Sequence, residues 1–287
     1  MWNTIEQAIA EATGKAFTLR DRSPVGGGCI NDAQRLDGEE ASFFVKTNDA
    51  GFLSLFEAEA EALREIAETG TIRVPQPICH GMAGDDRSFL VLEFIEPGPD
   101  SPASQRQLGE NLARLHKMRK EFFGWNRDNA IGSTPQPNDR GDDWSAFYRD
   151  HRLRFQFDLA ARKGKRFQGT EKLLERVPEL LADHEVFPSI LHGDLWGGNA
   201  AADTKGTPFV FDPATYYGDR ETDLAFTEMF GGFSTDFRKA YENAFPLDVG
   251  YPRRKILYNL YHLLNHFNIF GGGYATSAQG SMEELLH

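Results

Sequence analysis

One stretch in the last third of the chain constrains the fold more than any other. Residues 190–199 read ILHGDLWGGN, so a short apolar run ends in the tripeptide HGD, and Asn199 follows its aspartate, Asp194, by five positions. After a turn, a second apolar run ends in Asp212. Phosphoryl transfer needs a carboxylate that orients and deprotonates the attacking hydroxyl, and an asparagine and a second aspartate that hold Mg2+. The spacing therefore predicts a kinase-type site.

The pattern also assigns a role to each of these side chains. We interpret Asp194 as the catalytic base and Asn199 and Asp212 as the metal ligands, because the interval from Asp to Asn equals that of the protein-kinase run H-R-D-x-x-x-x-N. The alternative is a Gly-rich turn whose Asp and Asn only satisfy backbone donors. His-x-Asp alone would favour that alternative, but the correctly spaced Asn and the Asp that ends the next strand favour catalysis.

A lysine and a glutamate in the first third of the chain extend the predicted site. The apolar run 42–45 ends in Lys46, as in the kinase strand that carries the phosphate-pairing lysine. Glu59 lies in the middle of the apolar stripe of a helix expected at about 53–68. Since an unpaired buried charge is costly, we expect Glu59 to pair with Lys46. The alternative places Glu59 at the edge of the stripe, in contact with water.

Three consecutive glycines, Gly26, Gly27 and Gly28, lie between two expected strands at about 17–22 and 30–36. No Lys-Ser or Lys-Thr pair follows them, which excludes a Walker A loop. What remains is a strand-loop-strand hairpin in which backbone N–H groups can approach the phosphates of a nucleotide. Alone, this is weak evidence, because a triple glycine is more often a flexible turn.

The composition changes abruptly near residue 97. Residues 89–95 form an apolar run typical of a buried strand, and the segment that follows is rich in Pro, Gly and Ser. We therefore expect an α+β chain of two lobes, with an antiparallel-sheet lobe over 1–97, a linker over 98–103 and a mainly helical lobe over 104–287. In such a fold the backbone of Glu93, Phe94 and Ile95 would hydrogen-bond an adenine.

Hydrophobic periodicity predicts where the helices lie. A short helix is expected to begin after Thr4 and to end at Gly14, and residues 74–78 read as an extended linker. The helical patterns of the second lobe follow residue 104 and occupy about 143–162, 170–183, 220–230, 235–245 and 252–270. His262 and His266 on the last of these are expected to be structural.

Charge and cysteine content limit the class of partner. The 43 acidic residues outnumber the 31 basic ones, for a net charge of -12, which argues against a nucleic acid and favours a cationic substrate. The N-terminus lacks the basic and apolar regions of a signal peptide, and no window approaches about 18 uninterrupted apolar residues. We therefore expect a cytoplasmic protein without a membrane partner. The two cysteines, Cys29 and Cys79, provide neither a disulfide framework nor a Cys-rich metal site.

Several runs together resemble the fructosamine kinase (ketosamine-3-kinase) family. The most specific are LHGDLW at 191–196 and MFGGF at 229–233, whereas the wider aminoglycoside phosphotransferase and choline kinase group shares only the HxDxxxxN pattern and the later Asp. Gly197 departs from the family, in which serine is common after the tryptophan. Further runs extend the resemblance over essentially the whole chain: GGGCI at 26–30, FFVK at 43–46, FEAE at 56–59, the loop at 123–138, FDPATYYG at 211–218 and LNH at 264–266.

The resemblance implies a two-lobed protein-kinase-like fold that uses ATP and Mg2+ to phosphorylate the 3-hydroxyl of ketosamines. The substrates would be small ketosamines or glycated lysines of proteins, and the unstable 3-phosphate would release the amine, which amounts to deglycation. Trp196, beside the base, is a candidate wall for the sugar, and its alternative is a ring packed under the loop. His192 and Tyr216 are further candidates for substrate contact.

Two other functions stay open at this point. One is an aminoglycoside, choline or homoserine kinase of the same fold, against which Trp196 and the run 229–233 argue. The other is a nucleotide-binding pseudokinase that acts as a regulator, against which the intact set of Lys46, Asp194 and the two metal ligands argues.

Cys29 follows the three glycines and is a redox candidate. The family resemblance implies redox sensitivity at this cysteine through disulfide-linked dimers, so a homodimer is a possible partner. We predict that an oxidant lowers activity reversibly through Cys29 and not through Cys79. The alternative is that Cys29 is a small buried hydrophobic residue.

Overall fold

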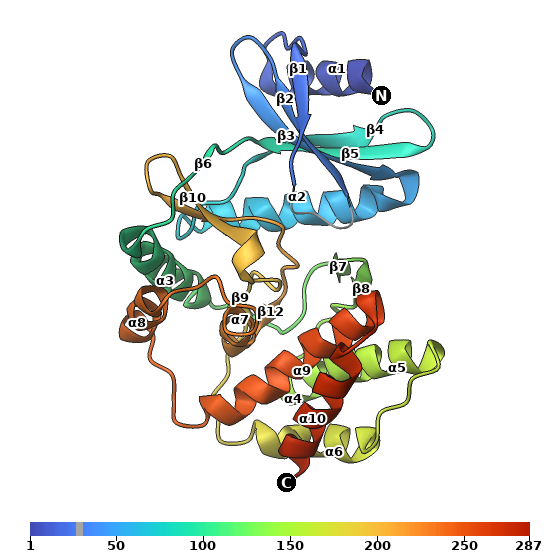
Figure 1. Ribbon diagram of the computed structural model, residues 1–287, viewed down its shortest axis with the longest axis vertical. Helices are drawn as coiled ribbons and strands as arrows, with labels where there is room; N and C mark the ends of the chain where they lie inside the picture. The colour runs from blue at the N-terminus through green and yellow to red at the C-terminus, as the bar shows by residue number, and fades with distance from the viewer. Residues whose placement is uncertain (27–30) are drawn as a thin grey trace.

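The structure, a computed structural model that describes residues 1–26 and 31–287, has two lobes (Figure 1). The first lobe contains a five-stranded antiparallel sheet with the strand order β1-β2-β3-β5-β4. The predicted α+β class, an antiparallel-sheet lobe followed by a mainly helical one, is confirmed. The strands of the sheet are β1 (Asp21–Pro24), β2 (Asp32–Asp37), β3 (Ser42–Asp49), β4 (Pro77–Met82) and β5 (Arg87–Glu93).

Two helices cover the two faces of this sheet, with α1 (Trp2–Thr13) on one side and α2 (Leu53–Glu68) on the other (Figure 1). Successive residues of a strand point to opposite faces. Val91 of β5 accordingly packs in the small cluster that contains Ile9 of α1, whereas Leu92 packs in the large cluster that contains the buried residues of α2. The helix α2 thus belongs to the same hydrophobic core as the second lobe.

Some elements differ from the sequence predictions. The first helix begins at Trp2 rather than after Thr4, and no side chain caps it, although it does end at Gly14 with φ of 68°. The expected linker at 74–78 overlaps a strand, because β4 begins at Pro77 and pairs with β5. The helix α10 (Tyr274–Leu286) was not predicted; it packs against α9 and α6 of the second lobe.

The connection between the lobes is itself hydrogen-bonded. A two-residue strand, β6 (Pro97–Gly98), pairs with β10 (Ala200–Asp203), which in turn pairs with β11 (Pro208–Val210). The approach at Gly98 is so close that a Cβ would lie 2.8 Å from the backbone carbon of Asp203, which explains the glycine. The linker therefore packs directly against the hairpin that follows the predicted catalytic loop.

The second lobe is mainly helical. Its helices are α3 (Pro102–His116), α4 (Trp144–Phe147), α5 (Phe155–Arg162), α6 (Thr170–Leu180), α7 (Glu221–Thr227), α8 (Thr235–Ala244), α9 (Tyr251–Phe270) and α10. A π-helical segment (Tyr148–Arg154) joins α4 to α5. Two small sheets complete the lobe: β7 (Asn129–Ile131) with β8 (Thr134–Gln136), and β9 (Ser189–Ile190) with β12 (Tyr217–Gly218).

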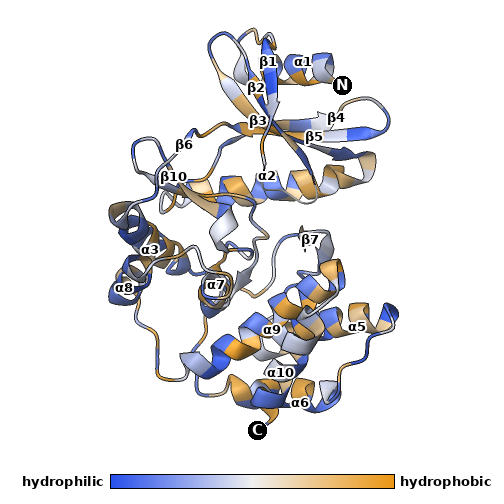
Figure 2. Cartoon of the chain, in the orientation of Figure 1, coloured by the Kyte–Doolittle hydropathy of each residue, from blue (hydrophilic) through white to orange (hydrophobic). Residues whose placement is uncertain are grey.

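The long helix α9 runs through the core of this lobe. Leu257, Leu260 and Leu264 on it are fully buried, as the spacing of three and four residues predicts. Figure 2 shows hydrophobic and hydrophilic residues mixed along α2 and α9, as expected for amphipathic helices. None of the described helices is both long and apolar enough to cross a membrane.

Candidate active site

The predicted catalytic loop follows β9 and is held in shape by backbone contacts. The backbone N–H of Ala214 donates to the oxygen of His192 at 2.9 Å, and that of Leu191 donates to Tyr216 at 3.1 Å. Between them Gly193 has φ of 82°, and a Cβ there would overlap the backbone oxygen of Ala214. Only glycine suits this turn, which presents the next residue, Asp194, to the space between the lobes.

A buried aspartate of α7, Asp223, fixes the same loop from the inside. Its carboxylate accepts hydrogen bonds from the backbone N–H groups of His192 at 2.7 Å and Gly193 at 2.8 Å, and it lies 3.1 Å from Nε2 of His116. Burial opposes ionisation of Asp223, but the contact with His116 and the backbone donors outweigh burial and lower its pKa. Sequence reasoning missed both Asp223 and His116. The available signal was an acidic residue directly before the short apolar run 224–226.

Asp194 has the environment of a general base. Its Oδ2 lies 3.2 Å from the amide nitrogen of Asn199. Burial, together with the negative charge of Asp212, raises the pKa of Asp194 to about 7, although the hydrogen bond from Asn199 opposes the shift. A base with a pKa near the working pH combines a useful deprotonated fraction with enough basicity to accept a proton.

Asn199 and Asp212 offer oxygen atoms next to this base. The amide nitrogen of Asn199 donates to the backbone oxygen of Asp194 at 2.8 Å, which leaves its carbonyl oxygen to face other groups. Asp212 has φ of 57°, the left-handed conformation that non-glycine residues adopt mainly where function requires it. Carboxylate and amide oxygens are the ligands that Mg2+ prefers, so this donor set fits the predicted metal.

The predicted ion pair between β3 and α2 is present. Nζ of Lys46 lies 2.7 Å from Oε1 of Glu59 and 2.6 Å from Oδ1 of Asp212. The side chain of Glu59 is only 13% exposed, so the alternative in which it reaches water is wrong. Burial disfavours the charge of Lys46, but the two carboxylates outweigh burial and raise its pKa.

The helix that carries Glu59 is also tied to the second lobe through Glu65. This side chain accepts hydrogen bonds from Nε1 of Trp125 at 2.9 Å and from the hydroxyl of Tyr217 at 2.7 Å. Nζ of Lys120 lies 2.7 Å from the same carboxylate. These three partners come from the segment after α3 and from β12, so α2 is fixed to the body that contains the catalytic loop.

Two adjoining cavities meet at these residues. The larger, of about 450 Å3, has Phe44, Phe209 and Phe211 among its walls and also contains the predicted nucleotide-binding positions Gly26, Lys46, Glu93, Phe94 and Ile95. The smaller, of about 230 Å3, has Asp194, Trp196 and Glu59 among its walls. Asn31, Lys46, Asn199 and Asp212 line both cavities. A group in one cavity would therefore lie next to a group in the other.

Not all predicted substrate residues reach the smaller cavity. Trp196 does, and its side chain is 37% exposed, which fits a wall better than a ring packed under the loop. The prediction that His192 and Tyr216 contact the substrate is corrected, because both are buried and neither is among the described lining residues. Nε2 of His192 donates to the backbone oxygen of Phe211 at 2.9 Å, and the ring of Tyr216 packs under the guanidinium of Arg152.

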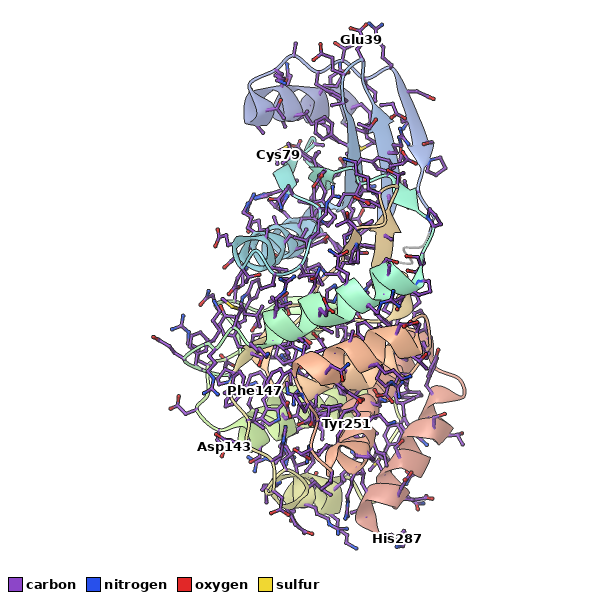
Figure 3. All side chains as sticks on the ribbon, turned by 90° about the vertical axis from the view of Figure 1, so that its left-hand side faces the viewer. Glu39, Cys79, Asp143, Phe147, Tyr251 and His287 are labelled. Carbon is purple, nitrogen blue, oxygen red and sulfur yellow. The ribbon has the colours of Figure 1, made fainter. Side chains whose placement is uncertain are left out.

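The glycine-rich loop is only partly described. Gly27, Gly28 and Cys29 lie outside the described residues, so their predicted roles stay predictions. Cys79 belongs to β4 of the sheet lobe (Figure 3), where burial raises the pKa of its thiol to about 11. A thiol of this kind is a poor nucleophile at neutral pH, in line with the expectation that Cys79 is not the redox-sensitive cysteine.

The departure at Gly197 has a packing explanation. A Cβ at this position would lie 2.8 Å from the backbone oxygen of Gly231 and 2.8 Å from Cα of Gly232. The residue that follows the LHGDLW run is therefore in backbone contact with the MFGGF run, and glycine at 197 allows the approach.

The comparisons with known proteins agree on one family. The model of a family described as fructosamine kinase matches residues 1–287. A Synechocystis protein described as a ketoamine kinase is 48% identical over 99% of this chain and 97% of its own length. The chloroplastic protein-ribulosamine 3-kinase of Arabidopsis thaliana is 41% identical over 95% of this chain and 85% of its own length.

Solved structures give the same result for the fold. A crystal structure described as a fructosamine-3-kinase from Haemophilus somnus 129PT superposes with a TM-score of 0.94 at 33% identity, covering 100% of this chain and 98% of the other. A choline kinase from Streptococcus pneumoniae superposes with a TM-score of 0.66 at 15% identity, covering 100% and 98%. The second similarity concerns the fold alone.

Proposed function

Since this chain belongs to the fructosamine kinase family, we propose that it transfers the terminal phosphate of ATP to the 3-hydroxyl of ketosamines. The observation that carries the proposal is the meeting of two cavities at Lys46, Asn199 and Asp212, with Asp194 in the wall of the smaller one. The larger cavity has the volume and the apolar walls for a nucleotide, and the smaller one has the volume for a sugar.

Each charged residue then has one task. Lys46, held by Glu59, pairs with phosphate oxygens of ATP, whose adenine lies against the backbone of residues 93–95. Mg2+, when bound, neutralises charge on the phosphates, and Asp212 and the carbonyl oxygen of Asn199 are the groups that would hold it. Asp194 orients the sugar hydroxyl and accepts its proton as the new P–O bond forms and the bond from the terminal phosphorus to the ADP oxygen breaks, so that ADP leaves.

We propose deglycation as the consequence of this reaction. The 3-phosphate of a ketosamine is expected to be unstable and to release the amine, which would restore the unmodified amino group. The name of the chloroplastic relative, a protein-ribulosamine 3-kinase, supports glycated proteins as one class of substrate. A cytoplasmic location, a homodimer and redox control at Cys29 stay predictions from the sequence.

The substrate class can be tested with a panel of acceptors. Purified protein with ATP and Mg2+ is expected to turn over fructosamine and ribulosamine adducts with kcat/KM at least about 100 times that for kanamycin or choline, a difference of about 2.7 kcal/mol in transition-state binding. Coupled detection of ADP gives the rates. Efficient turnover of kanamycin without any ketosamine would overturn the proposal, and ATP binding without turnover of any acceptor would favour the pseudokinase alternative.

The contacts of Glu65 with the second lobe lead to a second prediction. Glu65→Gln removes the charge that binds Trp125, Tyr217 and Lys120. The helix α2 should then position Glu59 less well against Lys46 of β3. We expect kcat/KM for ATP to fall about tenfold, equivalent to about 1.4 kcal/mol, the scale of one charge-assisted hydrogen bond. Steady-state kinetics with a saturating ketosamine would measure the change.

Glu68→Gln is the matched control, because Glu68 lies on the same helix and is exposed. It should leave kcat/KM within about twofold, since surface substitutions change little. Equal kcat/KM values for Glu65→Gln and Glu68→Gln would show that the contacts of Glu65 do not position α2.

A further inference from the structure

The smaller cavity carries an excess of negative charge. Glu59, Asp194 and Asp212 line it, and Lys46 is the only lysine or arginine among its described lining residues. Lys46 is already engaged by both Glu59 and Asp212. The undescribed residues 27–30 are Gly-Gly-Cys-Ile and carry no basic side chain. An anionic group of a substrate that entered this cavity would therefore meet no unpaired cation from these residues.

The solvent-facing side of the cavity extends this charge pattern. Trp196 and Phe270 line it there, with 37% and 58% of their surfaces exposed. Phe270 is the last residue of α9, a helix of 20 residues that has no basic residue in its last turn and ends between the lobes beside β7 and β8 (Figure 1). The C-terminal end of a helix carries partial negative charge, which attracts a cation and repels an anion; Nζ of Lys163, which donates to the backbone oxygen of Asn268, offsets part of this charge.

The remaining described walls on this side supply no positive charge. His266 lines the cavity, but burial lowers its pKa, so the imidazole is neutral at neutral pH. Phe52 and Leu55, at the start of α2, contribute apolar side chains. The first N–H group of α2, that of Leu53, already donates to the oxygen of Ala50, which limits the attraction of this helix end for an anion.

We propose that this cavity selects ketosamines by the charge next to their amine, accepting the secondary ammonium group and rejecting a carboxylate close to it. This inference rests on the proposed function, in which the sugar binds beside Asp194, and it adds that the amine substituent points toward Trp196 and Phe270. Adducts of lysine side chains and of neutral alkylamines are then good substrates. Adducts of α-amino acids through their α-nitrogen are poor ones, because their carboxylate lies next to the ammonium group.

A matched pair of substrates tests the inference. The fructose adducts of β-alaninamide and β-alanine have nearly the same shape and differ in a carboxamide against a carboxylate. We expect kcat/KM to be at least about tenfold higher for the amide at low ionic strength, and the ratio to shrink with added salt because salt screens the exposed part of the interaction. Equal kcat/KM for the two adducts would overturn the inference and leave the proposed function intact. Turnover of neither adduct would overturn the proposed function and the inference with it.

A pair of variants at the end of α9 locates the effect. Phe270→Lys places a cation where the inference puts the substrate carboxylate, and Phe270→Gln is its uncharged control at the same exposed position. The ratio of kcat/KM between amide and acid adducts should fall at least about fivefold in Phe270→Lys relative to Phe270→Gln. The ratio cancels any common loss of activity. An unchanged ratio in Phe270→Lys would contradict the inference that the amine substituent lies on the solvent-facing side of the cavity.

Discussion

Asp194→Asn is expected to lower kcat by about 1,000-fold or more, because a positioned general base contributes about 100-fold to 10,000-fold and asparagine cannot accept the proton. The substitution keeps the size of the side chain and leaves Lys46 and Glu59 in place. The affinity for ATP should therefore stay within about threefold of the wild-type value. Single-turnover kinetics and equilibrium nucleotide binding would measure the two effects separately. Retention of activity within about tenfold of wild type would mean that Asp194 is not the base.

The same variant should be more stable than the wild type. The pKa of Asp194 rises from an ordinary 3.8 to about 7 in the folded protein. Between these two pH values the folded state binds more protons than the unfolded state, so the contribution of Asp194 to stability falls as pH rises and stays unfavourable above pH 7. Without nucleotide and metal, Asp194→Asn should raise Tm at pH 8 by a few degrees, and the gain should vanish near pH 4. A lower Tm at pH 8 would contradict the inference that burial and the charge of Asp212 destabilise this carboxylate.

The second large effect is expected at Asp223, which the sequence did not identify. Asp223→Asn turns one acceptor oxygen into an N–H donor, so a backbone N–H of His192 or Gly193 loses its partner inside the protein. A buried donor without a partner costs about 1–3 kcal/mol, and the loss of the charge next to His116 adds to this cost. We expect the free energy of unfolding to fall by about 2–4 kcal/mol and kcat to fall about 100-fold, because the loop no longer holds Asp194 in place.

Chemical denaturation and steady-state kinetics would measure these changes at Asp223. Asp158→Asn is the matched control, since Asp158 is exposed on α5, and it should change the free energy of unfolding by no more than about 0.5 kcal/mol. If Asp223→Asn lost stability but kept the wild-type kcat, the carboxylate would serve the core and not the catalytic loop.

The residues of the candidate site could be predicted because chemistry fixes both their type and their spacing. Asp194 and Asn199 lie on one short loop, so five positions of sequence determine their distance in space. The pair of Lys46 and Glu59 needed one further step, the phase of a helix, and the cost of burying an unpaired charge supplied it. Local sequence and elementary electrostatics were sufficient at these four residues.

Long-range contacts could not be predicted in the same way. Asp223 reaches the catalytic loop from a later helix, and His116 reaches Asp223 from α3, so no local spacing connects them. His192 and Tyr216 lie close in sequence to candidate catalytic residues, yet both are buried. The helix α10 has glycine, serine and other polar residues around a narrow stripe of Ala278, Met282 and Leu285, which gives weak periodicity.

If Asp194 directs the phosphate of ATP to the 3-hydroxyl of a ketosamine, the product must carry its phosphate on carbon 3. A fructosamine adduct of a neutral alkylamine would be incubated with ATP, Mg2+ and the purified protein, and the product would be examined by two-dimensional 31P–1H NMR. We expect coupling of the new phosphorus to the proton on carbon 3, followed by release of the free amine, and no such product with Asp194→Asn. Phosphate on another hydroxyl, or an unmodified ketosamine beside phosphorylated kanamycin in a parallel reaction, would contradict this expectation.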